Sequence, residues 1–267
     1  IEPSTYQYRE IGIPVVLSGI DPGTAEKFNE FIEMPFNMQI LSGSSSGSAD
    51  EKSDIVPGKA VAVKLVEGDM SAAAIGTCTY VSGDTILAFG HPLFQKGNVH
   101  YPISEAHIYT VLPKSDISFK MGRPFSDDYG SILQDRVTGV LAMKGDVSPM
   151  VPVTYNINNK EYNLDVIQDE DMLTSLVPMM FISAVTNQFN SSGPLTVNYT
   201  MEMFTSAGSF KYKNMVSSEA SGFMIYMDMM SLMTAYLKNI FISPVTDSMK
   251  IYADVTEQLN VLGIEDI

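Results

Sequence analysis

The sequence predicts a mainly β protein with a few helices, in which a barrel or sandwich domain is followed by a second, smaller β-rich domain. From position 57, short apolar runs recur about every ten residues, and Gly/Asp turns such as 67–69 and 82–84 separate them. After a polar stretch at 186–194, further runs alternate between apolar and polar residues, which indicates the second domain.

Residues 1–41 are predicted to form an α/β connector. Residues 8–20 have the composition of a strand that enters a turn. The D-P-G-T string at 21–24 suits a helix start, because Asp or Thr can cap a helix and Pro fits its first turn. Apolar residues at helical spacing follow at 25–34. The polar, low-complexity stretch at 42–56 is predicted to be a flexible linker.

Residues 57–185 are predicted to form the main β domain, which ends in a helix. The expected strands are 60–66, 72–81, 85–89, 107–112, 131–143, 150–157 and 161–167. Residues 169–185 are expected to be helical, because acidic residues begin the segment and apolar residues follow at helical spacing.

Residues 195–267 are predicted to form the smaller β-rich domain with one helix. The expected strands are 195–204, 210–216, 240–242 and 249–255, and the expected helix is 222–238. Most of the 18 methionines fall at apolar positions of these elements, so we expect them to fill cores.

Charge and composition exclude several classes of partner. The net charge of −15, from 31 acidic and 16 basic residues, argues against binding of nucleic acid or of an anionic membrane surface. No direct membrane span is predicted, because the apolar run at 173–185 is shorter than the roughly 20 residues that cross a bilayer.

No metal or other cofactor is predicted. Cys78 is the single cysteine and lies in an apolar stretch, so it is expected to be a buried, inert thiol without a disulfide partner. The histidines are His91, His100 and His107, and no pair has the i, i+4 spacing of a helical zinc site. The chain begins at Ile1 rather than Met, so we expect a fragment or a processed product, and a missing targeting signal does not bear on location.

One block of sequence carries a family resemblance. The string G-T-C-T-Y at 76–80 leads through a turn to G-H-P at 90–92. This block resembles the "G-T-V-T-Y … G-H" block of the SpoIVB peptidase family. Shorter pieces at 109–113, 118–120 and 134–136 are similar too, so that the resemblance covers about residues 8–185.

The resemblance implies a serine peptidase with the two-barrel, chymotrypsin-like architecture, of which this chain would supply one half. His91 matches the general base, which takes a proton from a serine hydroxyl. Gly90 and Pro92 would hold its ring at the end of a strand. Asp135 is the candidate for the acid that orients the histidine, although the Asp of an Asp-Arg doublet more often pairs at the surface with its Arg, here Arg136, or with another basic residue. Asp116 is a weaker alternative.

The chain departs from the family at the nucleophile. The family's serine lies in a "G-M-S-G-S-P" block, and this sequence has no such block. The nearest strings, at 45–48 and 191–194, lie in the linker and at the domain boundary, where no rigid backbone would build an oxyanion hole. Some larger relatives carry the serine block ahead of the histidine block, and residues 13–19 are similar to their connector. We therefore expect an upstream segment to supply the serine.

Two functions follow from these observations, and a third stays open. The first is part of a serine-peptidase-like protein of the periplasm, cell envelope or exterior, which acts on a protein or peptide with His91 as base. The second is a non-catalytic scaffold or interaction module that binds envelope proteins or copies of itself through exposed sheet edges. The third is a sugar-binding sandwich, although the chain has no tryptophan to stack on a sugar ring.

Overall fold

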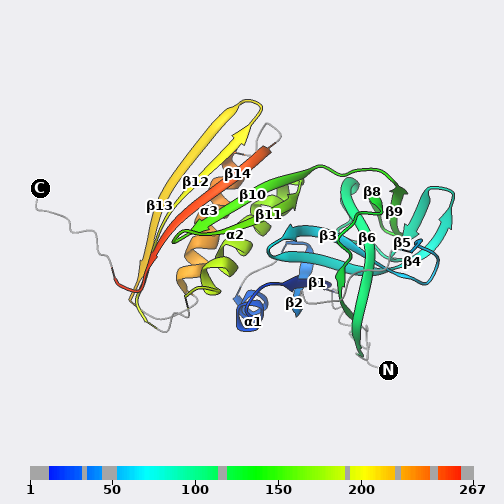
Figure 1. Cartoon of the computed structure of the whole chain (residues 1–267), viewed down its shortest axis with the longest axis horizontal. Helices are drawn as coiled ribbons and strands as arrows, with labels where there is room; N and C mark the ends of the chain where they lie inside the picture. Colours follow the sequence, from blue (N-terminus) through cyan, green and yellow to red (C-terminus); the bar gives the residue numbers. More distant parts are fainter. Residues whose placement is uncertain are drawn as a thin grey trace, which may run out of the picture.

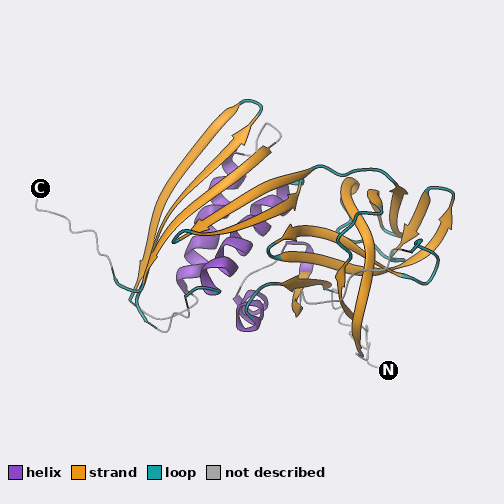
Figure 2. Ribbon diagram, in the orientation of Figure 1, coloured by secondary structure: helices purple, strands orange, loops and turns teal. Residues whose placement is uncertain are grey.

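In the residues that the structure describes, the protein is mainly β with three α-helices, which confirms the predicted class (Figures 1 and 2). The computed structural model describes residues 12–31, 35–43, 53–113, 119–189, 193–219, 224–240 and 246–259. Figure 1 shows a group of curved strands, which includes β3 to β9, beside a second layer of strands that is covered on one face by helices. Nearly all described strands belong to one hydrogen-bonded sheet that runs through both parts.

Six strands close into an antiparallel barrel. Their hydrogen-bonded order is β3-β6-β8-β9-β5-β4, and β4 pairs back with β3 to complete the circle. The strands are β3 (Ala60–Gly68), β4 (Ser71–Ser82), β5 (Thr85–Ala88), β6 (Gly97–Leu112), β8 (Gly130–Arg136) and β9 (Gly139–Lys144). The predicted strand at 131–143 is therefore two strands joined by a tight turn. Residues 61–66 of β3 are all buried, so this strand is covered on both of its faces, and Val61 and Val63 belong to the apolar core.

Several N-terminal elements extend the barrel at β4. β1 (Ile13–Ser18) pairs antiparallel with β4 and in parallel with β2 (Met38–Gly43). Between them lie α1 (Pro22–Phe31) and the short 3-10 helix η1 (Pro35–Asn37). The predicted cap of α1 is confirmed, because the Thr24 N–H donates to Asp21 Oδ2 at 3.0 Å. β7 (Phe119–Pro124) forms a hairpin with β6 and packs against β4 and the N-terminal strands β1 and β2.

The second layer is a five-stranded stretch of the sheet with two helices on one face (Figure 2). Its order is β13-β12-β14-β10-β11, and β11 continues the sheet into β3 of the barrel. The strands are β10 (Met150–Ile157), β11 (Lys160–Ile167), β12 (Leu195–Thr205), β13 (Gly208–Ser218) and β14 (Thr246–Thr256). The helices are α2 (Glu170–Thr186) and α3 (Met224–Ile240), which pack against each other.

The strand pairing groups these elements differently from the predicted boundary at 186–194. β10 pairs in parallel with β14, and α2 packs on α3, so β10, β11 and α2 share a layer with the elements of 195–267 rather than with the barrel alone. The patterns of 57–185 could not reveal this, because the β10–β14 pairing joins segments far apart in the chain.

The structure also corrects two smaller predictions, which concern the linker at 42–56 and the strand at 240–242. The ends of the predicted 42–56 linker have fixed structure, since Ser42 and Gly43 belong to β2 and Ile55 is buried, while residues 44–52 lie outside the described parts. The predicted strand at 240–242 begins at Ile240, which is instead the last residue of α3, and its other residues lie outside the described parts.

Helix α2 is buried on all sides from Met172 to Val185, as a helix that is apolar all round must be. It contains Pro178, which has no N–H and so leaves the Thr174 carbonyl without its helical partner. The hydroxyl of Thr234 on α3 donates to that carbonyl at 3.1 Å. One hydrogen bond between the helices therefore compensates for the proline. Among the described residues, no helix is both long and apolar enough to cross a membrane.

We expect Leu176→Ala in α2 to lower the free energy of unfolding by about 2–5 kcal/mol, because the side chain is fully buried and leaves a cavity. Leu232→Ala in α3, where the leucine is 41% exposed, should cost less than about 1 kcal/mol. Chemical denaturation measures both values. Equal losses would show that α2 is not the buried centre of this layer.

Candidate functional site

The candidate site begins at a strained turn directly after β5. Phe89 has φ +72 and Gly90 has φ +73, and the Gly90 N–H donates to the Ala88 carbonyl at 3.0 Å. A bond between residues two apart around a residue with this φ is typical of a γ-turn of the rare, strained kind. A phenylalanine adopts such a backbone only where its surroundings hold it there.

The surroundings that hold Phe89 are the backbone of β4. A Cβ atom on Gly76 would lie 2.7 Å from Cζ of the Phe89 ring, so the ring rests where any other residue at 76 would place its side chain. The Phe89 N–H also donates to the Thr77 carbonyl at 2.9 Å. The strained turn is therefore fixed by the G-T pair of the block that carries the family resemblance.

His91 follows this turn and is exposed to solvent. Its Nδ1 lies 2.8 Å from the carbonyl oxygen of Pro92, and its ring meets the Phe89 ring edge to face at 5.7 Å between centroids. A carbonyl oxygen only accepts hydrogen bonds, so Nδ1 must carry the proton. In the neutral imidazole, Nε2 then keeps its lone pair and is the nitrogen that can accept a proton.

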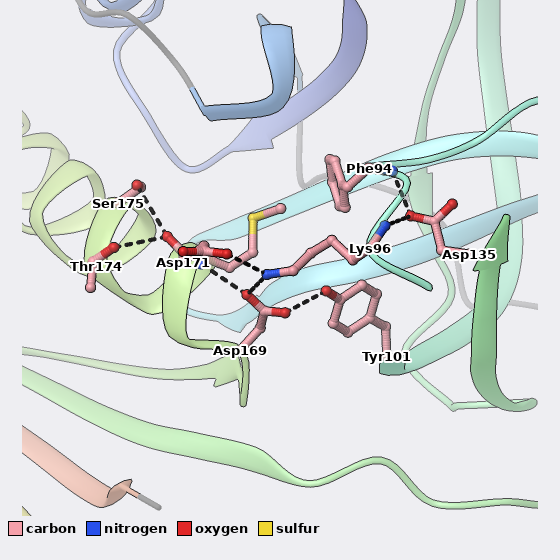
Figure 3. Close-up of polar contacts among 9 residues, drawn as sticks. Phe94, Lys96, Tyr101, Asp135, Asp169, Asp171, Thr174 and Ser175 are labelled. Carbon is pink, nitrogen blue, oxygen red and sulfur yellow. Dashed lines mark hydrogen bonds and ion pairs between the residues drawn. The ribbon is translucent and has the colours of Figure 1, made fainter. Parts of the chain in front are cut away.

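Asp135 lies near His91 but contacts the backbone of its loop rather than its ring. The carboxylate comes from β8 and is fully buried, and its Oδ1 accepts the Leu93 N–H at 2.8 Å. Oδ2 accepts the N–H groups of Phe94 at 2.6 Å and Lys96 at 3.3 Å, as Figure 3 shows. Among the described residues, no hydrogen bond joins Asp135 to His91. Asp135 thus positions the loop, and its predicted role of orienting the imidazole directly stays a prediction.

The alternative role for Asp135, a surface pair with Arg136, is wrong. Asp135 has no exposed surface, whereas the Arg136 guanidinium bonds to Asn98 Oδ1 at 2.8 Å. Adjacent residues of a strand point to opposite faces, so an Asp-Arg doublet within β8 separates its two charges.

The far end of the same loop is tied to helix α2. Lys96 Nζ contacts Asp169 Oδ1 at 2.5 Å and Asp171 Oδ2 at 2.8 Å, and the Tyr101 hydroxyl donates to Asp169 Oδ2 at 2.6 Å (Figure 3). Burial opposes the charge of Lys96, but the two carboxylates outweigh it and raise the pKa of the ammonium. Asp169 also caps α2 by accepting the Met172 N–H at 3.2 Å. The loop is therefore connected to both layers.

A pocket of about 620 Å³ opens beside His91. It lies where β1 diverges from β4, since pairing of β4 with β1 ends at Ala74 and pairing with β5 begins only at Cys78. The described lining is apolar apart from a few groups and contains no Asp or Glu. Its residues are Gly12, Ile13, Pro14, Phe36, Asn37, Ala74, Ile75, Gly76, Thr77, Phe89, His91, Pro92, Leu93, Phe94, Gln95, Phe119 and Lys120.

Lys120 and Thr77 form a polar pair in this pocket. The Lys120 ammonium donates to Thr77 Oγ1, and burial lowers the pKa of Lys120. Both residues lie within sequence pieces that carry the family resemblance, at 76–80 and 118–120, but neither was predicted as a site residue. The signal that could have found them is a lysine placed between two large apolar residues, Phe119 and Met121.

The remaining sequence candidates lie elsewhere or outside the described residues. Cys78 is buried as predicted, and burial raises the pKa of its thiol. His100 pairs with Asp146 at 2.6 Å. Asp116 and the serine strings, Ser45–Ser48 and Ser191–Ser192, lie outside the described residues. In the parts of the chain that are described, no three His, Cys, Asp or Glu residues cluster as a metal ion would need.

Comparison with models of protein families and with curated proteins found no match for this chain. The resemblance to the SpoIVB peptidase family accordingly rests on the block at 76–92 and its flanking pieces alone.

We expect Asp135→Asn to lower the free energy of unfolding by about 1–3 kcal/mol, because the amide replaces one accepting oxygen with a donor that faces backbone N–H groups. Hydrogen exchange should become faster at the amides of Leu93 and Phe94. The control is Asp84→Asn in an exposed turn, which should change stability by less than about 0.5 kcal/mol. Unchanged exchange at both amides would contradict the positioning role.

We expect Gly76→Ala to cost about 1–3 kcal/mol, because the added methyl group would overlap the Phe89 ring and displace it from its turn. Gly145→Ala is the control, since a Cβ there meets no heavy atom of the described residues within 4 Å, although its φ of +76 adds some backbone strain. Thermal unfolding compares the two variants. A loss no larger than that of the control would mean that the Phe89 ring moves freely.

Proposed function

We propose that this chain is part of an extracytoplasmic serine-peptidase-like protein in which His91 is the general base. The observation that carries the proposal is an exposed imidazole with Nε2 unbonded among the described residues, on a braced loop at the edge of a pocket. A serine hydroxyl becomes nucleophilic only when a neighbouring base accepts its proton. Nε2 is the ring nitrogen in the correct state for that step, because Nδ1–H is directed to the Pro92 carbonyl.

The rigidity of the loop supports this role. General bases act well only when the geometry of proton transfer is fixed in advance. Here the backbone before His91 is held by Phe89 against Gly76, and the backbone after it is held by Asp135 and Lys96. In this arrangement the Pro92 carbonyl fixes the tautomer, a task that a carboxylate performs in the Ser-His-Asp triad.

The pocket suits a peptide substrate. Its volume is in the range of sites that bind small ligands or short peptide segments, and its walls are largely apolar. On the pocket side, Ile75–Thr77 of β4 have no strand partner among the described residues. An extended peptide can add to such an edge by backbone hydrogen bonds.

The proposal requires a nucleophile from another segment. Within the described lining of the pocket there is no serine or cysteine side chain. The serine would come from a segment of the same precursor or of another chain, docked so that its hydroxyl reaches His91 Nε2. The extracytoplasmic location is part of the proposal and rests on the family resemblance.

A second candidate is a non-catalytic module that binds peptides in the same pocket. Two observations favour it: Nδ1 of His91 faces a carbonyl instead of a carboxylate, and no serine or cysteine belongs to the described lining. In this case His91 would have no catalytic role, and peptide binding would not lead to cleavage.

Labelling by a fluorophosphonate probe separates the two candidates. In the native full-length protein we expect a serine to be labelled, and His91→Ala should slow labelling by about 100-fold or more, the usual contribution of a general base. His107→Ala is the control, because His107 is exposed on β6 and outside the pocket lining. Labelling of wild type that is unaffected by His91→Ala contradicts the first candidate, and no labelling of the folded wild-type protein favours the second.

A further inference from the structure

Lys120 differs from the other partly buried lysines in its partner. Lys59 pairs with Glu105 at 3.1 Å, Lys64 with Glu67 and Asp128, and Lys96 with two aspartates. Lys120 contacts only the neutral hydroxyl of Thr77 among the described residues. The chain has a net charge of −15, yet among the described residues no carboxylate lines the pocket beside this ammonium. A partly desolvated cation without an anion is costly, and an anionic ligand removes that cost.

The walls around Lys120 are aromatic. The rings of Phe36, Phe89, Phe94 and Phe119 line the pocket, and its described lining contains no carboxylate. Such a pocket favours a ligand with an apolar group next to a negative charge. It disfavours cationic and strongly polar ligands, which would lose hydration without gaining partners.

The exposed edge of β4 indicates which class of molecule carries the negative charge of the ligand. The Thr77 carbonyl points to the pocket side, where it accepts the Phe89 N–H. Alternate residues of a strand direct their backbone groups to the same side, so the Ile75 carbonyl and the Thr77 N–H point there as well. β1 has separated from β4 at this level, because its pairing ends at Ala74. The backbone of a ligand could therefore form hydrogen bonds with β4 in the space that β1 leaves, which favours a peptide over a fatty acid.

We propose that the pocket binds the C-terminal end of a peptide, with the free carboxylate at Lys120 Nζ and Thr77 Oγ1, an apolar last side chain among the four phenylalanines, and the backbone along Ile75–Thr77. This inference rests on the proposed function in taking a peptide as the ligand, and it names the part of the peptide that is recognised. It holds for the catalytic and the non-catalytic candidate alike. In the catalytic case it directs cleavage to the ends of substrates.

Fluorescence polarisation tests the proposal with one peptide in two forms. The probe is fluorescein-Gly-Ser-Gly-Ala-Val-Phe with either a free C-terminal carboxylate or a C-terminal amide. We expect the acid to bind wild type at least about tenfold more tightly than the amide, because a charge-assisted hydrogen bond is lost on amidation. Lys120→Met should weaken binding of the acid by about the same factor and leave the amide unchanged.

Two further variants distinguish the charge at position 120 from the overall charge of the protein. Lys120→Arg retains the charge and should preserve the preference for the acid, and circular dichroism checks that each variant is folded. Lys213→Met is the control, since Lys213 is an exposed lysine on β13, outside the pocket lining, and its loss should leave both affinities unchanged. Loss of the preference in Lys213→Met would trace it to overall charge and overturn the proposal.

Other outcomes also overturn it. They are equal binding of acid and amide by wild type, no binding of either form, or an equal loss of both in Lys120→Met. Displacement of the acid by decanoate, with decanoate the tighter ligand, would assign the pocket to a fatty acid. The fluorophosphonate reaction is measured separately, so labelling without a preference for the acid rejects this inference alone, and the preference without labelling rejects the catalytic candidate alone.

Discussion

The loop from His91 to Lys96 has no regular secondary structure, so its backbone amides need partners from outside the loop. The buried carboxylate of Asp135 provides them, by accepting three N–H groups from Leu93, Phe94 and Lys96. Buried amides without partners and a buried carboxylate without hydrogen bonds are each costly, and here each removes the cost of the other. The position of His91, the shape of the pocket edge and the direction of Lys96 all depend on this arrangement.

Helix α2 extends that constraint through the molecule. Near its N-terminus, Asp169 and Asp171 hold Lys96 and hence the His91 loop. At its other end, Thr24 of α1 donates to the Thr186 hydroxyl at 3.1 Å, and Asn187 Nδ2 donates to the Gly19 carbonyl at 2.7 Å. The connector that contains β1 and the loop that contains His91 line the same pocket, and both are attached to one buried helix. The second layer thus fixes the distance between two walls of the site.

The pocket lies beside a short part of β4 that has no strand partner on that side. β1 and β5 both pair with β4, but their ranges leave Ile75–Thr77 between them without a partner on that side among the described residues. Gly76 accommodates the Phe89 ring there, and Lys120 extends from the β6–β7 hairpin to Thr77. The described lining of this cleft thus brings an unpaired strand edge, four phenylalanine rings and one lysine together in a chain of net negative charge.

The sequence by itself determined most strands, the helix at 169–185 and the histidine loop, because these features follow from local periodicity, caps and the G-H-P turn. It also singled out Asp135, through the matched piece at 134–136, although not the contacts that Asp135 makes. The tertiary structure alone decided that β10 and β14 pair in parallel, that Asp135 binds loop amides, and that Lys120 meets Thr77. Each of these contacts joins residues far apart in the chain. A local pattern records which residues are buried, whereas closure of the barrel and packing of the second layer select which buried residues meet.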